Sequence, residues 1–227
     1  MDFKEGEILY FDKPLGLTSF QVVGKVRWLL CRKLGVKKLK VGHAGTLDPL
    51  ATGVLILCTG KATKRIESLQ AGVKEYVATL RLGATTPSYD LEKPIDAEYP
   101  TDHIDEALVR RVLEGFRGEI MQVPPVFSAV KVDGRRAYSY ARSGEEVEIQ
   151  PKKLVIEEIE LLQCNLPDIV IRVVCSKGTY IRALARDIGQ ALQSGAHLTA
   201  LRRTRVGEVR VEDCTTIEAF ENYLDTI

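Results

Sequence analysis

The chain has 227 residues, of which 45% are hydrophobic and 28% charged, and its formal net charge at pH 7 is +1. This length allows one large domain, or a domain with a sizeable insertion, and the composition provides for a substantial hydrophobic core. The opening stretch, MDFKEGEILYFDKP, lacks the apolar segment of a secretion signal, and the longest apolar runs are too short to span a bilayer. Five scattered cysteines without a C-x-x-C pair favour a reducing compartment, the cytoplasm.

The first third of the chain predicts two strands around a helix, followed by a second helix and a third strand. Residues 7–14 predict a short strand ended by Pro14, and Thr18 or Ser19 then caps a helix that extends to about Cys31. A basic loop follows and leads into a glycine-rich stretch. The remaining elements are a buried strand at 54–58, a short helix over 61–70 that ends at Gly72, and an alternating strand at 74–83.

The rest of the chain predicts a loop, two helices, a hairpin and a pair of strands. Residues 84–100 read as loop, Asp133-Gly134 as a hairpin turn, and 153–164 with 168–178 as adjacent antiparallel strands. A helix over 104–116 places Ile104, Leu108, Val112 and Phe116 on or near one face, and a helix over 179–192 makes Arg182 and Arg186 neighbours one turn apart. Because helices and strands do not alternate as βαβ repeats, the fold class is α+β, with a mixed, mainly antiparallel sheet.

Charge is unevenly distributed along the nearly neutral chain. Residues 1–65 hold twelve Lys and Arg against five Asp and Glu, and residues 169–210 hold eight against two. Residues 90–125 and the tail 211–227 are acidic. If the two basic segments meet in space, they form the positive face that a phosphate backbone requires; otherwise they are solvated surface.

The stretch GHAGTLDPLATG, residues 42–53, holds a single carboxylate, Asp48. Pro49 restricts the backbone behind the aspartate, and the glycines around it allow tight backbone paths. Such a loop could hold a carboxylate rigidly at a cleft, or the aspartate could merely cap a turn.

Several other residues have both a functional and a plain interpretation. His43 could be a general base or a nucleic-acid contact, Tyr76 could stack on an unpaired base or belong to the core, and Arg182 could pair with a carboxylate such as Asp48 or lie on the surface. The sequence contains no activated-serine motif, no nucleotide-binding glycine motif and no histidine spacing typical of metal ligands. It therefore indicates no metal and no nucleotide cofactor.

These stretches together resemble the bacterial-type tRNA pseudouridine synthases of the TruB family, which act on uridine 55 in the T-loop. The resemblance covers almost the whole chain and is carried by DKPLGLTSFQVV, GHAGTLDPLATGVLILCTGKATK, KEYVATLRLGATTPSYD, FRGEIMQVPPVFSAVKVDGRRAYSYAR, CSKGTYIRALARDIG and AHLTALRRTRVG. It implies the pseudouridine-synthase fold, with a catalytic cleft across the sheet and helices and loops around it.

The resemblance also implies roles for individual residues. Asp48 matches the catalytic aspartate, Tyr76 the tyrosine that stacks on the target base, and Arg182 the arginine that pairs with the aspartate. The expected substrate contacts are His43, Tyr76, Tyr180 and Leu201, and we add the nearby Lys64. Residues of about 124–152 match an insertion that clamps the RNA. We therefore expect one catalytic domain over 1–227, acting as a monomer on the T-loop arm of tRNA, with neither membrane nor metal as a partner.

Two stretches depart from the usual family pattern. Many members carry a further small C-terminal RNA-binding domain, for which the sequence after Cys214 leaves no room, and ATTPSYDLE differs from a commoner version rich in threonine and aspartate. Neither departure involves Asp48, Tyr76 or Arg182.

The chemistry of uridine isomerisation explains a lone carboxylate. The N-glycosidic bond breaks, the base turns, and C5 joins C1′, which calls for one carboxylate as nucleophile or as stabiliser of a cationic sugar. The base must leave the stack, so a stacking aromatic and an electropositive surface are also needed, whereas no cofactor is. Three alternatives stay open: a tRNA-folding chaperone, an RNA-guided pseudouridine synthase, and a nucleoside glycosidase, which would need a second carboxylate to activate water.

Overall fold

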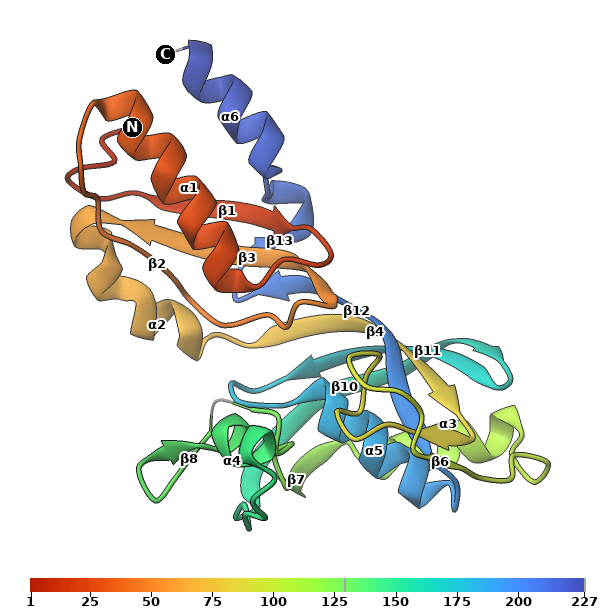
Figure 1. Ribbon diagram of the computed structural model, residues 1–227. Helices are drawn as coiled ribbons and strands as arrows, with labels where there is room; N and C mark the ends of the chain where they lie inside the picture. Colours follow the sequence, from red (N-terminus) through yellow and green to blue (C-terminus); the bar gives the residue numbers. More distant parts are fainter. Residues whose placement is uncertain (129, 227) are drawn as a thin grey trace. The chain divides into compact units, whose positions relative to one another are not determined.

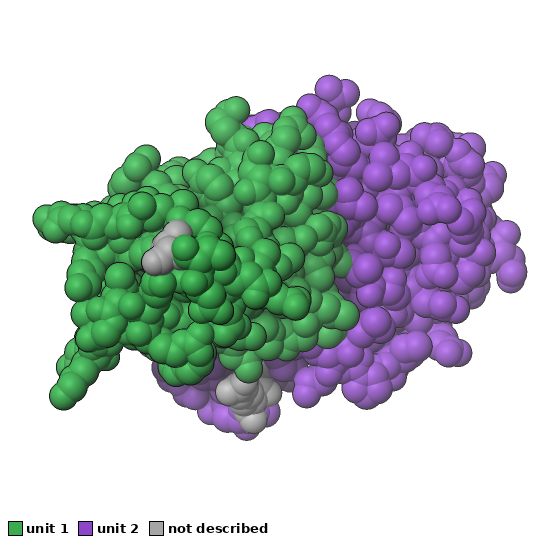
Figure 2. Space-filling model, turned by 90° about the horizontal axis from the view of Figure 1, so that it is seen from above, with its two compact units in different colours: residues 1–76, 201–227 green, residues 77–200 purple. Residues whose placement is uncertain are grey.

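The computed structural model describes residues 1–128 and 130–226. The chain forms two compact units: residues 1–76 with 201–227, and residues 77–200 (Figure 2). Two long strands, β4 (Lys74–Leu82) and β12 (Ala196–Val206), contribute residues to both units (Figure 1). The structure confirms the predicted class, since it combines a mixed sheet with helices.

In the first unit the strand order is β1-β3-β12-β4. Strand β1 (Ile8–Lys13) pairs antiparallel with β3 (Ala51–Thr59), and β12 pairs parallel with β3 from Leu201 onward. Two short strands, β2 (Val41–His43) and β13 (Val209–Arg210), add to β3 and β12. The apolar run at 54–58 is the middle of β3, as predicted, and its side chains are buried on both faces of the sheet.

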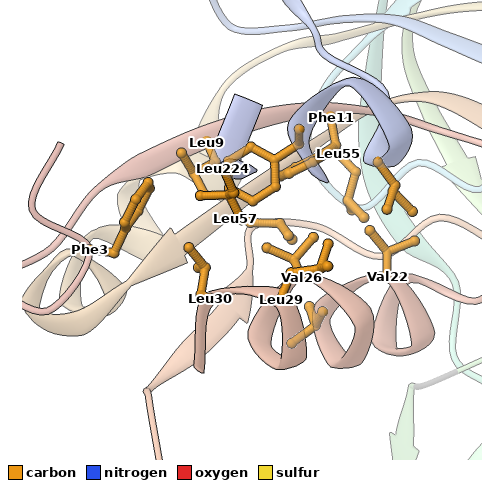
Figure 3. Close-up of a cluster of buried hydrophobic side chains, with 13 residues drawn as sticks. Phe3, Leu9, Phe11, Val22, Val26, Leu29, Leu30, Leu55, Leu57 and Leu224 are labelled. Carbon is orange, nitrogen blue, oxygen red and sulfur yellow. The ribbon is translucent and has the colours of Figure 1, made fainter. Parts of the chain in front are cut away.

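One face of β3 packs against helices α1 (Ser19–Leu34) and α6 (Ile217–Thr226), which share a core with β1 and β3 (Figure 3). Within that core the rings of Phe11 and Phe220 meet edge to face, with their centroids 5.2 Å apart. Thr18 caps α1 as predicted, and it forms a capping box with Gln21. The helix extends past the predicted end at Cys31, because Gly35, in the left-handed conformation, ends it instead.

The opposite face of β3, with Val54 and Ile56, packs against Ile66 and Leu69 of α2 (Ile66–Ala71). The predicted helix over 61–70 is therefore present, but its first part is a 3-10 helix, η1 (Gly60–Arg65), and Gly72 follows the end of α2. A second short 3-10 helix, η2 (Val211–Asp213), precedes α6.

In the second unit the strand order is β12-β4-β11-β10-β7. The predicted antiparallel pair is confirmed as β10 (Lys152–Asn165) and β11 (Asp168–Cys175), and β7 (Gly118–Gln122) pairs with β10. The predicted helix over 179–192 is α5 (Ile181–Ala191). The predicted loop over 84–100 contains two two-residue strands, β5 (Ala84–Thr85) and β6 (Ala97–Glu98), which pair with each other.

The predicted helix over 104–116 is present as the shorter α3 (Glu106–Glu114). Its buried residues are Val109 and Leu113, whereas Leu108 and Val112 are only partly buried. The helix starts two residues later than predicted, because Asp105 caps it.

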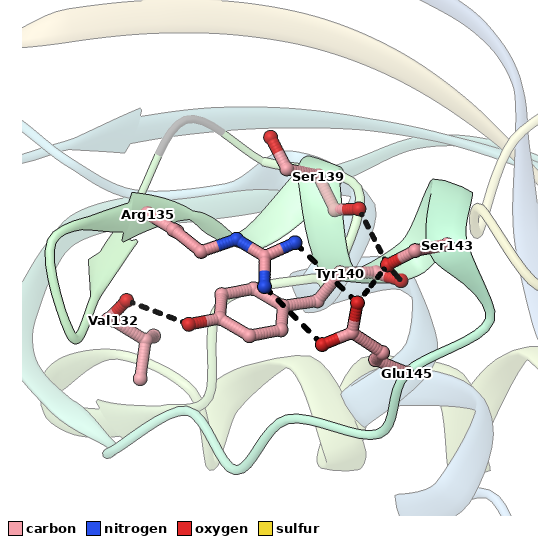
Figure 4. A network of polar contacts seen from close by, with 6 residues as sticks. All are labelled: Val132, Arg135, Ser139, Tyr140, Ser143 and Glu145. Carbon is pink, nitrogen blue, oxygen red and sulfur yellow. Dashed lines mark hydrogen bonds and ion pairs between the residues drawn. The ribbon is translucent and has the colours of Figure 1, made fainter.

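The expected insertion, about 124–152, contains a hairpin and a helix. Strands β8 (Lys131–Val132) and β9 (Arg135–Arg136) are joined by Asp133 and Gly134, which both have positive φ, so the predicted turn is confirmed. Helix α4 (Ala137–Ser143) follows. Arg135 pairs with Glu145 at 3.2 Å and stacks on the Tyr140 ring, which ties the hairpin to the helix (Figure 4).

Candidate active site

Asp48 lies in the loop between β2 and β3, in the first unit. Its backbone carbonyl accepts a hydrogen bond of 3.1 Å from the Ala51 N–H, which closes the turn through Pro49 into β3. Gly45, with φ of 105°, supplies the reversal at the start of the loop that a residue with a side chain would not readily make. The loop is thus short and tightly turned on both sides of the aspartate.

Three buried polar side chains hold the backbone of this loop. The Arg203 guanidinium, in β12, donates to the carbonyl oxygens of Gly45 (3.1 Å) and Thr46 (3.4 Å). Ser19, in α1, both accepts from the Leu47 N–H (2.8 Å) and donates to the Leu47 carbonyl (3.0 Å). Lys13, in β1, donates to the Pro49 carbonyl at 3.4 Å. Both chain neighbours of Asp48 are therefore fixed through their backbones, which orients the carboxylate between them.

Gly53 permits this arrangement. Its φ is 102°, and a Cβ there would collide with the carbonyl oxygen of Arg203, whose strand pairs parallel with β3 at this point. This close approach of the β3 and β12 backbones also brings the Arg203 side chain to the Val54 carbonyl, to which it donates a hydrogen bond of 2.8 Å. A glycine at position 53 is thus a condition for the contact between Arg203 and the loop.

Two of the three side chains that hold the loop are cations. Lys13 is fully buried, and this burial lowers its pKa to about 8, while attraction to Asp48 opposes the shift and repulsion from Arg203 adds to it. The Asp48 loop is therefore held by two cationic side chains.

His43 ends β2, just before the loop. Its Nδ1 is buried and has no hydrogen-bond partner among residues 1–128 and 130–226. Burial, and then the charge of Arg203, lower the pKa of His43 below its ordinary value, so the imidazole is neutral at pH 7. The role of His43 as a contact to the substrate remains a prediction.

The other predicted contacts of the first unit lie on β4, β12 and η1. Tyr76 lies on the buried side of β4 and is 8% exposed, and Leu201 is the residue of β12 that pairs with Ala51, three positions after Asp48. Lys64 is exposed on η1. Leu201 is thus next to the Asp48 loop, while the stacking role of Tyr76 and the RNA contact of Lys64 remain predictions.

In the second unit Arg182 occupies the first turn of α5 and is only 5% exposed. Its Nη1 donates to the Ser88 carbonyl (3.2 Å) and its Nη2 to the Phe127 carbonyl (2.9 Å). Its Nε lies 3.7 Å from the carboxylate of Asp90, which is also buried. The guanidinium is therefore held in one orientation, and its pairing with Asp48 remains a prediction.

Tyr180 and Asp90 complete the surroundings of Arg182. The Gln122 side chain accepts from the Tyr180 N–H (2.9 Å) and donates to the Tyr180 carbonyl (3.2 Å), which fixes the chain just before α5. The sequence analysis did not identify Asp90, Lys13, Ser19 or Arg203. Asp90 lies in the turn PSYD, where a solvated acidic residue is common, so only its burial in the structure distinguishes it from a surface charge.

The described part of the chain contains no group of three or more His, Cys, Asp or Glu side chains that could hold a metal ion. No helix within 1–128 or 130–226 is both long and apolar enough to span a membrane.

Comparison with known proteins places these features in a family. Residues 32–181 match the TruB family pseudouridylate synthase N-terminal domain, and residues 182–226 match the tRNA pseudouridylate synthase B C-terminal domain. The chain is 72% identical over 225 residues to the tRNA pseudouridine synthase B of Phocaeicola vulgatus, covering 99% of this chain and 96% of that protein. It is 70% identical to the Bacteroides fragilis protein of the same name, covering 99% and 97%.

The similarity extends to solved structures. A chain in a Cbf5-Nop10-Gar1 complex superposes with a TM-score of 0.73 and is 32% identical in sequence. The comparison covers 99% of this chain and 57% of that chain, so this protein spans little more than half the length of its structural relative. The sequence matches and the shared fold agree: the chain belongs to the TruB family of pseudouridylate synthases.

Proposed function

We propose that this protein converts uridine 55 in the T-loop of tRNA to pseudouridine, with the Asp48 carboxylate as the catalytic group acting on a flipped-out uridine. Isomerisation of uridine in tRNA follows from the family to which the chain belongs. The position in the T-loop and the residue roles are our proposal. The observation that carries it is the Asp48 loop, in which buried side chains from β1, α1 and β12 bind the backbone on both sides of one carboxylate.

The reaction needs only such a carboxylate and a site that retains the base. The bond from N1 to C1′ breaks, the uracil turns, C5 bonds to C1′, and the C5 proton is lost to a base while N1 gains a proton. Substrate and product are isomers, so neither water nor a redox partner is consumed. Asp48 acts either as a nucleophile or as the stabiliser of a cationic sugar, and the side chains that hold its loop, Lys13, Ser19 and Arg203, include no second acid of the kind a glycosidase needs.

The remaining residues have supporting roles in this proposal. Tyr76 stacks on the uracil and accepts the C5 proton, Arg182 pairs with Asp48, and His43 helps to position the T-loop around the flipped uridine. Tyr180 and Leu201 line the uridine pocket, and Lys64 binds the phosphate backbone. Residues 1–227 act as one catalytic domain and as a monomer, with the insertion at about 124–152 closing over the T-loop arm.

The test is Asp48→Asn, assayed with an unmodified tRNA transcript and tritium release from C5-labelled uridine. The substitution keeps shape and hydrogen bonding but removes the charge, so isomerisation should fall by ~10³-fold or more while RNA binding persists. Asp102→Asn, at an exposed position, is the matched control and should keep the wild-type rate.

Each alternative predicts a different result. Substantial isomerisation by folded Asp48→Asn protein would overturn the catalytic role of Asp48, whereas wild-type protein that refolds tRNA without isomerising it would indicate a chaperone. Product that forms only with an added guide RNA would indicate a guided enzyme, and free uracil a glycosidase. Product at a site other than 55, tested with a transcript in which that uridine is cytidine, would refute the T-loop assignment.

A further inference from the structure

Two arginines on consecutive turns of α5 bridge the same two segments of the second unit. Arg182 binds the Ser88 carbonyl in the turn 86–90 and the Phe127 carbonyl in the segment 123–128, which leads from β7 into the insertion. Arg186, four residues later, contacts Tyr89 of the same turn and Val123 of the same segment. The second arginine thus repeats the bridge of the first, one helical turn further from the Asp90 carboxylate.

The contacts of Arg186 are specific. Its guanidinium carbon lies 5.1 Å from the centre of the Tyr89 ring, within the range of a cation–π interaction. Its Nη2 donates to the Val123 carbonyl at 3.0 Å. Its charge is balanced by Asp187, with Nε and Asp187 Oδ1 2.8 Å apart, and the side chain is only 15% exposed. Arg186 is therefore an ordered, nearly buried residue and not a solvated surface charge.

Tyr89 has an unusual backbone conformation for a residue with a side chain. Its φ is 61°, in the left-handed region, which is unfavourable for a tyrosine. The turn is held around it by hydrogen bonds from the Tyr89 N–H to the Thr86 carbonyl (3.0 Å) and from the Leu198 N–H to the Tyr89 carbonyl (2.9 Å). A glycine or asparagine would adopt this conformation more easily, so the side chain of Tyr89 must make a contact that compensates for the strain.

The turn matters because it delivers two of the three groups that hold Arg182, the third being the Phe127 carbonyl. Ser88 supplies a carbonyl and Asp90 a carboxylate, one residue on each side of Tyr89. The Asp90 carbonyl is itself bound by the Thr86 hydroxyl at 2.6 Å. Movement of Tyr89 away from α5 would carry both partners away from Arg182.

We propose that Arg186 and Tyr89 are positioning residues for Arg182. Their stack holds the turn 86–90 against α5, and the bond from Arg186 to Val123 holds the start of the insertion against the same helix. Neither residue touches the substrate; both act by fixing the orientation of Arg182. The inference rests on the proposed function, since only there does Arg182 take part in the reaction.

The decisive variant is Tyr89→Asn, which accepts the left-handed backbone and removes only the ring. The single-turnover rate with saturating tRNA should fall about tenfold, while the Kd for tRNA stays unchanged. Tyr89→Phe keeps the ring but removes the hydroxyl that also hydrogen-bonds to Arg186, so its rate should lie between those of wild type and Tyr89→Asn. Arg186→Met should reproduce the effect of Tyr89→Asn, and the double variant should be little worse than either single one, because the two residues act as a pair.

The controls separate this inference from a general loss of stability and from failure of the proposed function. Arg110→Met removes an exposed arginine of α3 that pairs with Glu106, and it should leave the rate unchanged. A wild-type rate for Tyr89→Asn or for Arg186→Met, with or without a lower melting temperature, would show that the stack is merely structural. If Arg182→Met, measured in parallel, is fully active, the assignment of Arg182 fails instead.

Discussion

The Asp48 loop and the surroundings of Arg182 each fix a charged side chain, but they do so through different contacts. In the first unit the residues around the functional group are held: Arg203, Ser19 and Lys13 bind backbone atoms of residues 45, 46, 47 and 49. In the second unit the functional group itself is held, since the Arg182 guanidinium binds two carbonyls and faces a carboxylate. A short carboxylate cannot be tethered without blocking its oxygens, so its loop must be rigid, whereas an arginine has five donors and can use some of them for positioning.

The largest loss of stability should come from replacing Arg203, the residue of β12 that binds the Asp48 loop. Arg203→Met leaves three carbonyls, one of them buried and two partly buried, without this donor, and the free energy of unfolding should fall by roughly 3–5 kcal/mol, measured by urea denaturation. Arg202→Met, at the preceding and partly exposed position, loses an ion pair with Asp12 and should cost less than about 1 kcal/mol. Equal effects of the two substitutions would show that the contact of Arg203 with the loop contributes little to stability.

In the second unit the corresponding change is Asp90→Asn. The amide cannot balance the charge of Arg182, and the resulting misplacement should lower the single-turnover rate roughly 10- to 100-fold while tRNA affinity persists. Asp96→Asn, at an exposed aspartate bound to Thr85, is the control. A loss of tRNA affinity as large as the loss of rate would mean that Asp90 shapes the RNA-binding surface instead.

In the first unit, Ser19→Ala should disturb the Asp48 loop less than Arg203→Met does. Both backbone groups of Leu47 lose their partner, so the unfolding free energy should fall by about 1–3 kcal/mol and the rate should fall with it. Thr18→Ala removes the cap of the same helix, at a similar energetic cost of about 1 kcal/mol, but does not contact the loop. The isomerisation rates of both variants are measured by stopped flow. An equal loss of rate in Thr18→Ala would mean that the stability of α1, and not the contact with Leu47, determines the position of Asp48.

The smallest expected effect is the contribution of Lys13 to the pH dependence of stability. Its pKa in the folded protein, about 8, lies below the ordinary lysine value of 10.5 in the unfolded chain. Between these values the unfolded state binds more protons, so the free energy of unfolding should gain a positive contribution as pH rises from 8 toward 10. Urea denaturation of wild type and Lys13→Met at pH 7, 8 and 9 should show this contribution only in the wild type. An identical pH dependence in both proteins would show that Lys13 keeps its ordinary pKa.

Local periodicity was enough to predict many elements, although it did not predict strands β7 and β12 or helix α6. The alternation at 74–83 and the apolar run at 54–58 are properties of consecutive residues, and the structure confirms β4 and β3 there. The same holds for the capping residue Thr18 and the turn Asp133-Gly134, whose chemistry acts over a few residues. Helix boundaries were predicted less well: α3 starts two residues later than predicted, and the first part of the predicted helix over 61–70 is a 3-10 helix.

The sequence by itself also determined the family and the candidates for the site, because a motif such as GHAGTLDPLATG is a property of residue order. Only the tertiary structure decided which side chains support them. Arg203 reaches carbonyls more than 150 positions earlier in the chain, and Lys13 is fully buried although lysines seldom are. No local pattern distinguishes a buried, hydrogen-bonded Arg203, Lys13 or Asp90 from a solvated charge, since burial depends on contacts between segments that are distant in sequence.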